Sequence, residues 1–240
     1  MRGLVQSAFL LGCLAVEGCS FGLNPVIDTT LSATDDGSQA PTDGAYDDET
    51  LPKTDVGLEG SVYRIQPSSM TVTQPPGLDA LKDKMLERDI LVFVASESPS
   101  KLGLSVAIAA DDGEQDPCET VRAFPDADWS ENPVFEAGPG EIDASFGGQP
   151  AVLRHTHFGG VFDADGQKWR DGTLLTQLDG RELRGSLGDV DVCDLVSAMG
   201  GGCEACDDGK ELCFQVAIED ITANRADMDF DERNDGGRCQ

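Results

Sequence analysis

Eight cysteines, unevenly spread along 240 residues, constrain this chain more than any other feature of its sequence. Two lie close to the N-terminus, and six follow in the body of the chain. An even set of cysteines is typical of an exported domain that closes its loops with disulfide bonds. The six are Cys118, Cys193, Cys203, Cys206, Cys213 and Cys239. Whether they can pair depends on whether the chain leaves the cytoplasm.

The first 18 residues indicate that it does. Arg2 supplies a basic start, and residues 3–16 form an apolar stretch. That stretch has the length of a secretory signal core and is too short to cross a bilayer core of about 30 Å as a helix. Cys19 follows the small residue Gly18, as in a bacterial lipoprotein that is cleaved and then acylated on cysteine. Residues 1–18 are therefore predicted to be a lipoprotein signal peptide.

Cys13 is the alternative lipidation site, because Leu10-Leu11-Gly12 before it also matches a lipobox. Acylating Cys19 leaves six later cysteines that can all pair, whereas acylating Cys13 leaves seven and one unpaired thiol. This parity favours Cys19. Glu17 is unusual in a lipobox, so an ordinary cleaved signal peptide without a lipid stays open.

The charge of the chain limits its partners. Cleavage before Cys19 would leave 16 basic and 44 acidic residues and keep the net charge of −28. Such a chain repels phosphate backbones and anionic membrane surfaces. We therefore expect no nucleic-acid partner and contact with a membrane only through the lipid anchor. The remaining partner classes are an unknown protein or a small ligand.

The composition changes at about residue 60. Residues 19–59 hold nine carboxylates against one basic residue, Lys53, with many Ser, Thr, Gly and Pro residues. Such a segment buries too little apolar surface to offset its ordering entropy, so it is predicted to be a disordered acidic tether. Residues 60–240 then form one domain, a size that suits a single core.

Apolar runs of strand length dominate this domain. An amphipathic helix is expected between about residues 77 and 88, and a second over residues 192–199, ending at the Gly200–Gly202 run. The fold class is therefore α+β and β-rich: an antiparallel sandwich or open barrel with about two short helices, braced by disulfides. The expected strands are residues 61–65, 90–95, 102–108, 151–162, 172–178 and 212–218.

The four cysteines between positions 193 and 213 allow three interpretations. Cys203-x2-Cys206 could be half of a zinc ribbon, but a second closely spaced pair is missing. A redox pair of the thioredoxin kind would need a βαβ context, which the sequence lacks. Two local disulfides within the cluster are the favoured interpretation, and by elimination Cys118 would then pair with Cys239.

Three polar groups could bind metal. His155 and His157 are two apart on an expected strand, so their side chains would share one face. Asp163-Ala164-Asp165-Gly166 resembles part of a calcium loop, although a hairpin turn explains it better. Asp227, Asp229 and Asp231 alternate like calcium ligands without matching an EF-hand, and a solvated acidic tail is the competing interpretation.

No nucleophile elbow, Walker loop, dinucleotide fingerprint or His-Glu-x-x-His motif occurs, so an enzyme is not expected. Two hypotheses remain. The first is a lipid-anchored binding or interaction module, with a contact surface near Trp129, Phe135 and Trp169, unless these aromatics form core. The second is a calcium-stabilised envelope protein that uses the loop Asp227–Asp231.

Several short stretches are similar to a family of myxobacterial-type outer-membrane lipoproteins with a six-cysteine β-rich domain. The resemblance covers most of the chain and implies a cellular location rather than an activity. Ser20 follows the lipid cysteine in place of the Asp that marks inner-membrane retention, so the implied location is the outer membrane. The matching stretches are Cys19-Ser20, Asn24-Pro25, Asp116-Pro117-Cys118, Phe124-Pro125, Asn132-Pro133, Gly160-x-Phe162 and Cys203-x2-Cys206.

Overall fold

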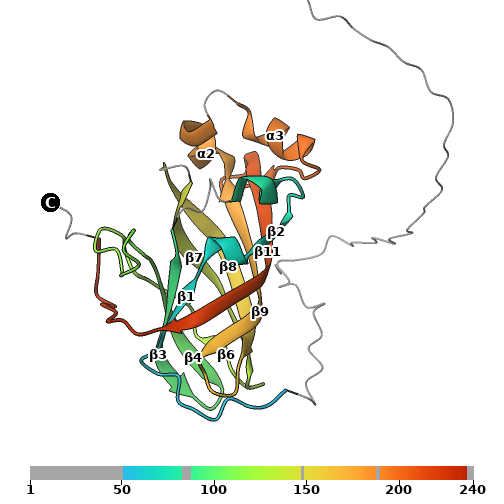
Figure 1. The fold of residues 1–240 in the computed structure, drawn as a ribbon. Helices are drawn as coiled ribbons and strands as arrows, with labels where there is room; N and C mark the ends of the chain where they lie inside the picture. Colours follow the sequence, from blue (N-terminus) through green and yellow to red (C-terminus); the bar gives the residue numbers. More distant parts are fainter. Residues whose placement is uncertain (1–50, 83–87, 147–148, 188–189, 237–240) are drawn as a thin grey trace, which may run out of the picture. The chain divides into compact units, whose positions relative to one another are not determined.

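Eight strands close into an antiparallel barrel (Figure 1). The structure is a computed structural model that describes residues 51–82, 88–146, 149–187 and 190–236, all within one compact unit. The ring closes because β1 pairs on one side with β3 and on the other with β11. In ring order the strands are β1 (Val62–Ile65), β3 (Ile90–Ser98), β4 (Lys101–Ile108), β6 (Ala127–Asp128), β7 (Val134–Phe146), β8 (Gln149–Phe162), β9 (Lys168–Asp179) and β11 (Glu211–Ala226).

Three short strands pair with strands of the ring but are not part of it. They are β2 (Thr71–Gln74) and β10 (Glu204–Ala205), which pair with β11, and β5 (Arg122–Ala123), which pairs with β4. Two helices, α2 (Gly180–Leu187) and α3 (Val192–Ala198), lie at one end of the barrel (Figure 1). The β-rich α+β prediction is confirmed, with a closed barrel in place of the sandwich alternative.

The interior of the barrel is the hydrophobic core. Side chains alternate along each strand, so every second residue points inward, and most of the inward residues are apolar. Thr156 and Thr176 are buried polar exceptions, with their hydroxyl oxygens 2.8 Å apart. In β9, Trp169, Leu174 and Leu178 are buried, while Thr173 and Gln177 between them are half-exposed. Aromatic rings fill the lower half of the interior, where Phe135 stacks on Trp169 with ring centroids 4.6 Å apart.

The lower end of the barrel is closed by residues 51–60, which corrects the predicted domain boundary. Leu58 is fully buried in the core, and Thr54 exchanges two backbone–side-chain hydrogen bonds with Asn132. The backbone N–H of Asp55 also donates to the carbonyl of Ala164. The tether prediction is therefore wrong for residues 54–59. A single buried leucine in an acidic stretch left no periodic signal that could have placed this segment in the domain.

The helix predicted between residues 77 and 88 is described only at its start. Residues Leu78–Leu81 form a 3-10 turn, η3, after a first 3-10 turn, η2 (Pro67–Ser69), and Lys82 is α-helical. Residues 83–87 lie outside the described residues, so the rest of that helix stays a prediction. The second predicted helix is confirmed as α3, where Asp191 caps the N-terminus by accepting from the N–H groups of Cys193 and Asp194.

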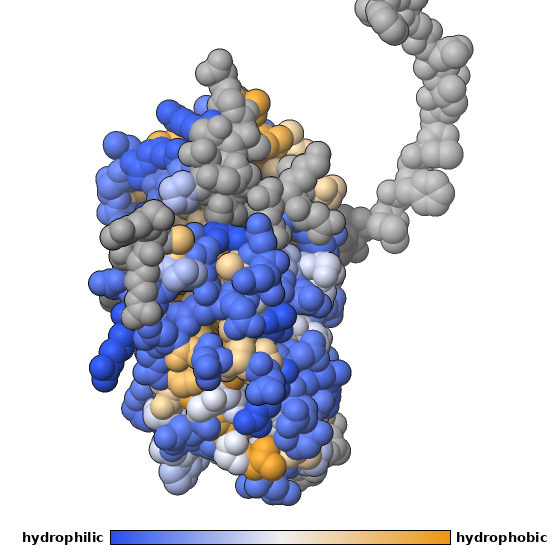
Figure 2. Space-filling view, turned by 60° about the vertical axis from the view of Figure 1, so that its left-hand side comes forward, coloured by the Kyte–Doolittle hydropathy of each residue, from blue (hydrophilic) through white to orange (hydrophobic). Residues whose placement is uncertain are grey.

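A second, smaller apolar cluster lies on the outside of β1, β3 and β4. Its centre is formed by Val62 and Leu91, and the segment after β11 packs over it, with Phe230 stacked on Phe93 at 4.8 Å. Figure 2, which brings forward the left-hand side of Figure 1, shows only small islands of apolar surface among hydrophilic residues. This face therefore offers no broad apolar patch for a partner.

Candidate functional site

The side chains of the two histidines do not share one face of a regular strand, as the sequence predicts. The pairing of β8 with β9 shifts register between Arg154 and His157, and His155 adopts a left-handed backbone with φ of 50°. The exposed imidazole of His155 lies 3.0 Å from the carboxylate of Asp207. Burial lowers the pKa of His157, whose Nε2 atom is buried without a hydrogen-bond partner. The bulge therefore gives the two rings different surroundings.

The two acidic segments, residues 163–166 and 227–231, do not bring three carboxylates together as a metal site would need. Asp163 begins the tight turn between β8 and β9, where its carbonyl accepts from Gly166, so the hairpin interpretation is confirmed. Among the described residues, one set of three metal-ligand groups lies within 4.8 Å of one another, and it excludes Asp227, Asp229 and Asp231. The geometry gives no support to a calcium site in that loop.

The three residues of that set are Asp179, Cys206 and Cys213, but the sulfur atoms of the two cysteines are bonded to each other. Cys193 and Cys203 form a second disulfide. The prediction of two local disulfides is confirmed. Because Cys203 and Cys206 belong to different disulfides, they have no free thiolates to bind zinc and do not form a redox pair with each other. Cys118 is also disulfide-bonded, whereas Cys239, its predicted partner, lies outside the described residues, so that pairing stays a prediction.

Next to the buried disulfide, Asp179 is fixed by Arg181. The guanidinium donates to both carboxylate oxygens, and it also donates to Asp208 in the disulfide loop at 2.5 Å. These hydrogen bonds lower the pKa of Asp179. The network joins α2 to the loop between Cys206 and Cys213, so its role is structural.

The aromatic residues named as a contact surface form core, which is the alternative that the sequence left open. Trp129, Phe135 and Trp169 are 2%, 1% and 2% exposed, and all three belong to the core. Their rings pack against one another and against Phe162 because the barrel interior is the one place wide enough to exclude water from them. A partner cannot reach them in this structure.

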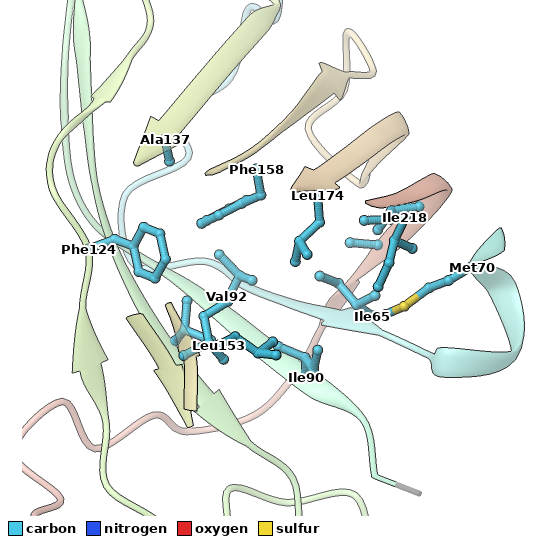
Figure 3. Close-up of a cluster of buried hydrophobic side chains, with 14 of the residues drawn as sticks. Ile65, Met70, Ile90, Val92, Phe124, Ala137, Leu153, Phe158, Leu174 and Ile218 are labelled. Atoms are coloured by element: carbon cyan, nitrogen blue, oxygen red, sulfur yellow. The ribbon is translucent and has the colours of Figure 1, made fainter. Parts of the chain in front are cut away.

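The barrel interior contains unfilled space above the aromatic floor. A cavity of about 20 Å³ lies next to Phe158, Trp169 and Leu174. The surface of the cavity is apolar, so the cavity is expected to be dry. The other lining residues are Ile65, Met70, Ile90, Val92, Val106, Ile142, Gly159, Thr173 and Ile221. Figure 3 shows side chains from opposite walls pointing toward one another, with Met70 beside Ile65 and Ile218.

The wall of the barrel is uneven around this cavity. Strands β7, β8, β9 and β11 have 13, 14, 12 and 16 residues, whereas β1, β3 and β4 have 4, 9 and 8. The pairing of β1 ends at Ile65, which lies opposite Ala223 of β11 and Ile90 of β3. Above that point β11 stays paired with β9 on one side, and on the other side it pairs with the short strand β2.

Residues 66–82, which we call the mouth segment, cover the gap that the short strands leave. Its apolar side chains Met70, Val72 and Leu78 are buried in the core. Backbone pairing and side-chain hydrogen bonds hold it: β2 pairs with β11, the Thr73 hydroxyl donates to the Ala217 carbonyl, the Val72 N–H donates to Asp79, and the Lys82 ammonium donates to the Met70 carbonyl. It also packs closely against the end of α3, where Gly77 lies against Met199. Among the described residues, no pairing joins β2 to β3.

Neither a family model, nor a curated protein, nor a solved structure matches this chain. Within the described ranges, no helix is both long and apolar enough to cross a membrane. Cys19 and the alternative Cys13 lie outside the described residues. The candidate site is therefore the apolar cavity, which sequence reasoning missed because its lining comes from seven ring strands and one loop.

Proposed function

We propose that this protein is a lipid-anchored binding module of the cell envelope that holds a small apolar ligand inside its barrel without converting it. The observation that carries the proposal is the character of the interior. The cavity is lined mainly by apolar side chains, and binding sites for small molecules are typically concave and mostly apolar. An eight-stranded barrel is just wide enough to be filled by side chains or to hold one small ligand.

We propose a role without catalysis because of the chemistry of the cavity lining. Proton transfer, nucleophilic attack and oxyanion stabilisation all need a polar group within about 3 Å of the reacting atom. No charged side chain lines the cavity. The side chains of His155 and Asp207, which contact each other, are at least half exposed to water.

The location in the cell envelope is proposed from the predicted signal peptide and from the resemblance to outer-membrane lipoproteins. Acylation at Cys19 would hold the barrel at the membrane, and the two local disulfides suit an oxidising compartment. Radiolabelled palmitate supplied to an expressing bacterium tests this address. The wild-type chain and Cys13→Ala should take up label, and Cys19→Ala should not; label retained by Cys19→Ala would contradict the assignment.

The binding role is tested on the full chain isolated from its own envelope. We expect extraction with organic solvent to release an apolar compound in a stable molar ratio, chemically unchanged after prolonged incubation with the protein. Extraction of the same membranes without the protein supplies the background. An extract without any enriched compound, or one whose compound is consumed during incubation, would contradict the proposal.

A further inference from the structure

The ring of the barrel has one weak junction, between β6 and β7. A single residue pair, Asp128 with Glu136, joins these two strands. Beyond that pair, residues 122–127 lie beside residues 137–144, and among the described strands no pairing joins the two segments. We call this unpaired boundary the seam. The other edge of β7 pairs with β8 from Val134 to Phe146, so the wall can part at the seam without breaking a ladder.

Two prolines explain why the seam is unpaired. The Phe124 N–H donates to the Leu104 carbonyl of β4. Successive N–H groups of a strand point to opposite sides, so the next N–H would point toward β7, but residue 125 is a proline and has none. Continuing the register of Asp128 with Glu136 by three residues places Pro125 opposite Pro139, which removes a donor from β7 as well.

A ring closes the inner side of the seam in place of backbone hydrogen bonds. Phe124 is buried and packs edge-on against Phe158, with ring centroids 4.9 Å apart (Figure 3). Its ring also lies so close to Gly140 that a Cβ atom on this glycine would come within 2.7 Å of it. Because Phe158 and Ile142 line the cavity, Phe124 is the next layer of the wall outside the cavity on this side.

An ion pair closes the outer side. The Arg122 guanidinium donates from Nε to Oδ2 of Asp143 at 2.7 Å and from Nη2 to Oδ1 at 3.0 Å. Both side chains are partly exposed to water. Ion pairs in such surroundings contribute little to stability, so this one can break and form again. The seam is therefore held by two side-chain contacts that need no change in the strand pairing of the ring.

We infer that the barrel wall opens at the seam, by separation of Arg122 from Asp143 and movement of the Phe124 ring away from Gly140, and that an uncharged small molecule reaches the cavity there. This inference rests on the proposed function and names the entry to the same site. Past the ion pair the path runs between Phe124 and Ile142, which offer a charged molecule no compensation for the water that it would lose.

The opening is measured by labelling a thiol with N-ethylmaleimide, which is uncharged. Ile142→Cys places the thiol beside the seam, and Ile221→Cys places it on the β11 wall of the same cavity. The two isoleucines are matched, being 3% and 2% exposed. Each variant is the full chain with Cys13→Ser and Cys19→Ser, so that neither N-terminal cysteine reacts. The reagent is larger than the cavity of about 20 Å³, so it reacts where the wall opens. We expect Ile142→Cys to react at least tenfold faster.

Breaking the ion pair should speed the opening. Arg122→Gln, added to each cysteine variant, should raise the labelling rate of Ile142→Cys several-fold and leave that of Ile221→Cys unchanged. Arg170→Gln is the matched control, because it removes a similarly exposed ion pair elsewhere on the barrel, and it should change neither rate.

Gly140→Ala tests the inner contact. Its methyl group would meet the Phe124 ring and displace it, so Ile142→Cys should again react several-fold faster, with no change at Ile221→Cys. Urea denaturation of every variant gives the share of labelling that passes through global unfolding, and this share is subtracted. If the Ile142→Cys chain does not unfold cooperatively, Ala144→Cys, which also packs against the core from β7, replaces it.

Equal corrected rates at the two positions, or a faster rate at Ile221→Cys, would overturn the inference. A rate at Ile142→Cys that Arg122→Gln does not change would overturn it too. The labelling needs no ligand, so its outcome is independent of the solvent extraction that tests the proposed function. An extract without an enriched compound would contradict the proposed function and leave the measured opening in place.

Discussion

The hydroxyl of Tyr63 donates a 2.7 Å hydrogen bond to the carbonyl oxygen of Gly166, which lies 103 residues further along the chain. Tyr63 belongs to the first strand of the barrel, and Gly166 to the tight turn between β8 and β9. The bond is buried at the closed end of the barrel, on the opposite side of the aromatic floor from the mouth segment. The bond therefore joins β1 to the turn between β8 and β9 at the closed end of the barrel.

Replacing Tyr63 with Phe should lower the free energy of unfolding by about 1–2 kcal/mol, because the carbonyl of Gly166 loses its donor while the ring stays in place. Urea denaturation followed by tryptophan fluorescence measures the change. Tyr46→Phe is the matched control, since it removes the other tyrosine hydroxyl from the predicted tether. Equal stability of Tyr63→Phe and wild type would show that the bond contributes nothing.

The same residue predicts a pH dependence. Burial is the main cause that raises the pKa of Tyr63 above its ordinary value of 10.0. A raised pKa in the folded state means that the folded chain retains its proton at a pH where the unfolded chain has lost it. The contribution to stability is therefore complete below about pH 10 and is lost as the pH rises above it.

Denaturation at several pH values between 8 and 11 should accordingly show a steeper loss of stability in wild type than in Tyr63→Phe. The phenylalanine variant has no hydroxyl to titrate and corrects for lysine and other alkaline effects. Parallel curves for the two proteins would contradict the assignment.

The two local disulfides should differ in their effect on stability. Their loops are similar, with sequence separations of 10 for Cys193–Cys203 and 7 for Cys206–Cys213, so chain entropy alone gives about 2–3 kcal/mol for each. Cys206 and Cys213 are buried, whereas Cys193 and Cys203 are partly exposed. Alanine at both buried positions removes sulfur from the interior as well and should cost more.

Thermal melting of the two double-alanine variants checks this order. We expect the Cys206→Ala/Cys213→Ala chain to melt at the lower temperature. Equal midpoints, or the reverse order, would mean that burial around the second disulfide adds nothing to its loop closure.

Calcium should not change the stability of the chain. Asp227, Asp229 and Asp231 are not brought together, so the ion would find no set of three carboxylates there. Melting curves in millimolar calcium and in excess chelator should have the same midpoint. A rise in the midpoint with calcium that disappears in Asp229→Asn would restore the calcium-stabilised alternative.

Much of the barrel could be predicted from the sequence because its strands are apolar runs with a period of two. Strands β3, β4, β8, β9 and β11 all include a predicted run. Strand β7 was missed because Gly138, Pro139 and Gly140 interrupt it, and the structure absorbs them in a register shift between Ala137 and Gly140. Helix α2 was missed because its residues, Gly180–Leu187, include two glycines and few apolar side chains.

The candidate site could not be predicted in the same way. Val92, Phe158 and Ile221 meet at the cavity only because the ring closes, and closure depends on the short strand β1 pairing with both neighbours. Nothing local in the sequence marks Met70 as the residue that shares this space. The polar motifs that the sequence did highlight, at His155 and at Asp227–Asp231, lie on the outside of the barrel or beyond its last strand.

The central claim is that the interior of the barrel holds a ligand, and a crystal structure of the chain isolated from its own envelope tests it most directly. We expect continuous elongated electron density against Trp169 and Leu174, with Met70 displaced from its place beside Ile218. An interior in which Met70 packs against Ile218, with only empty space next to Trp169, would contradict it.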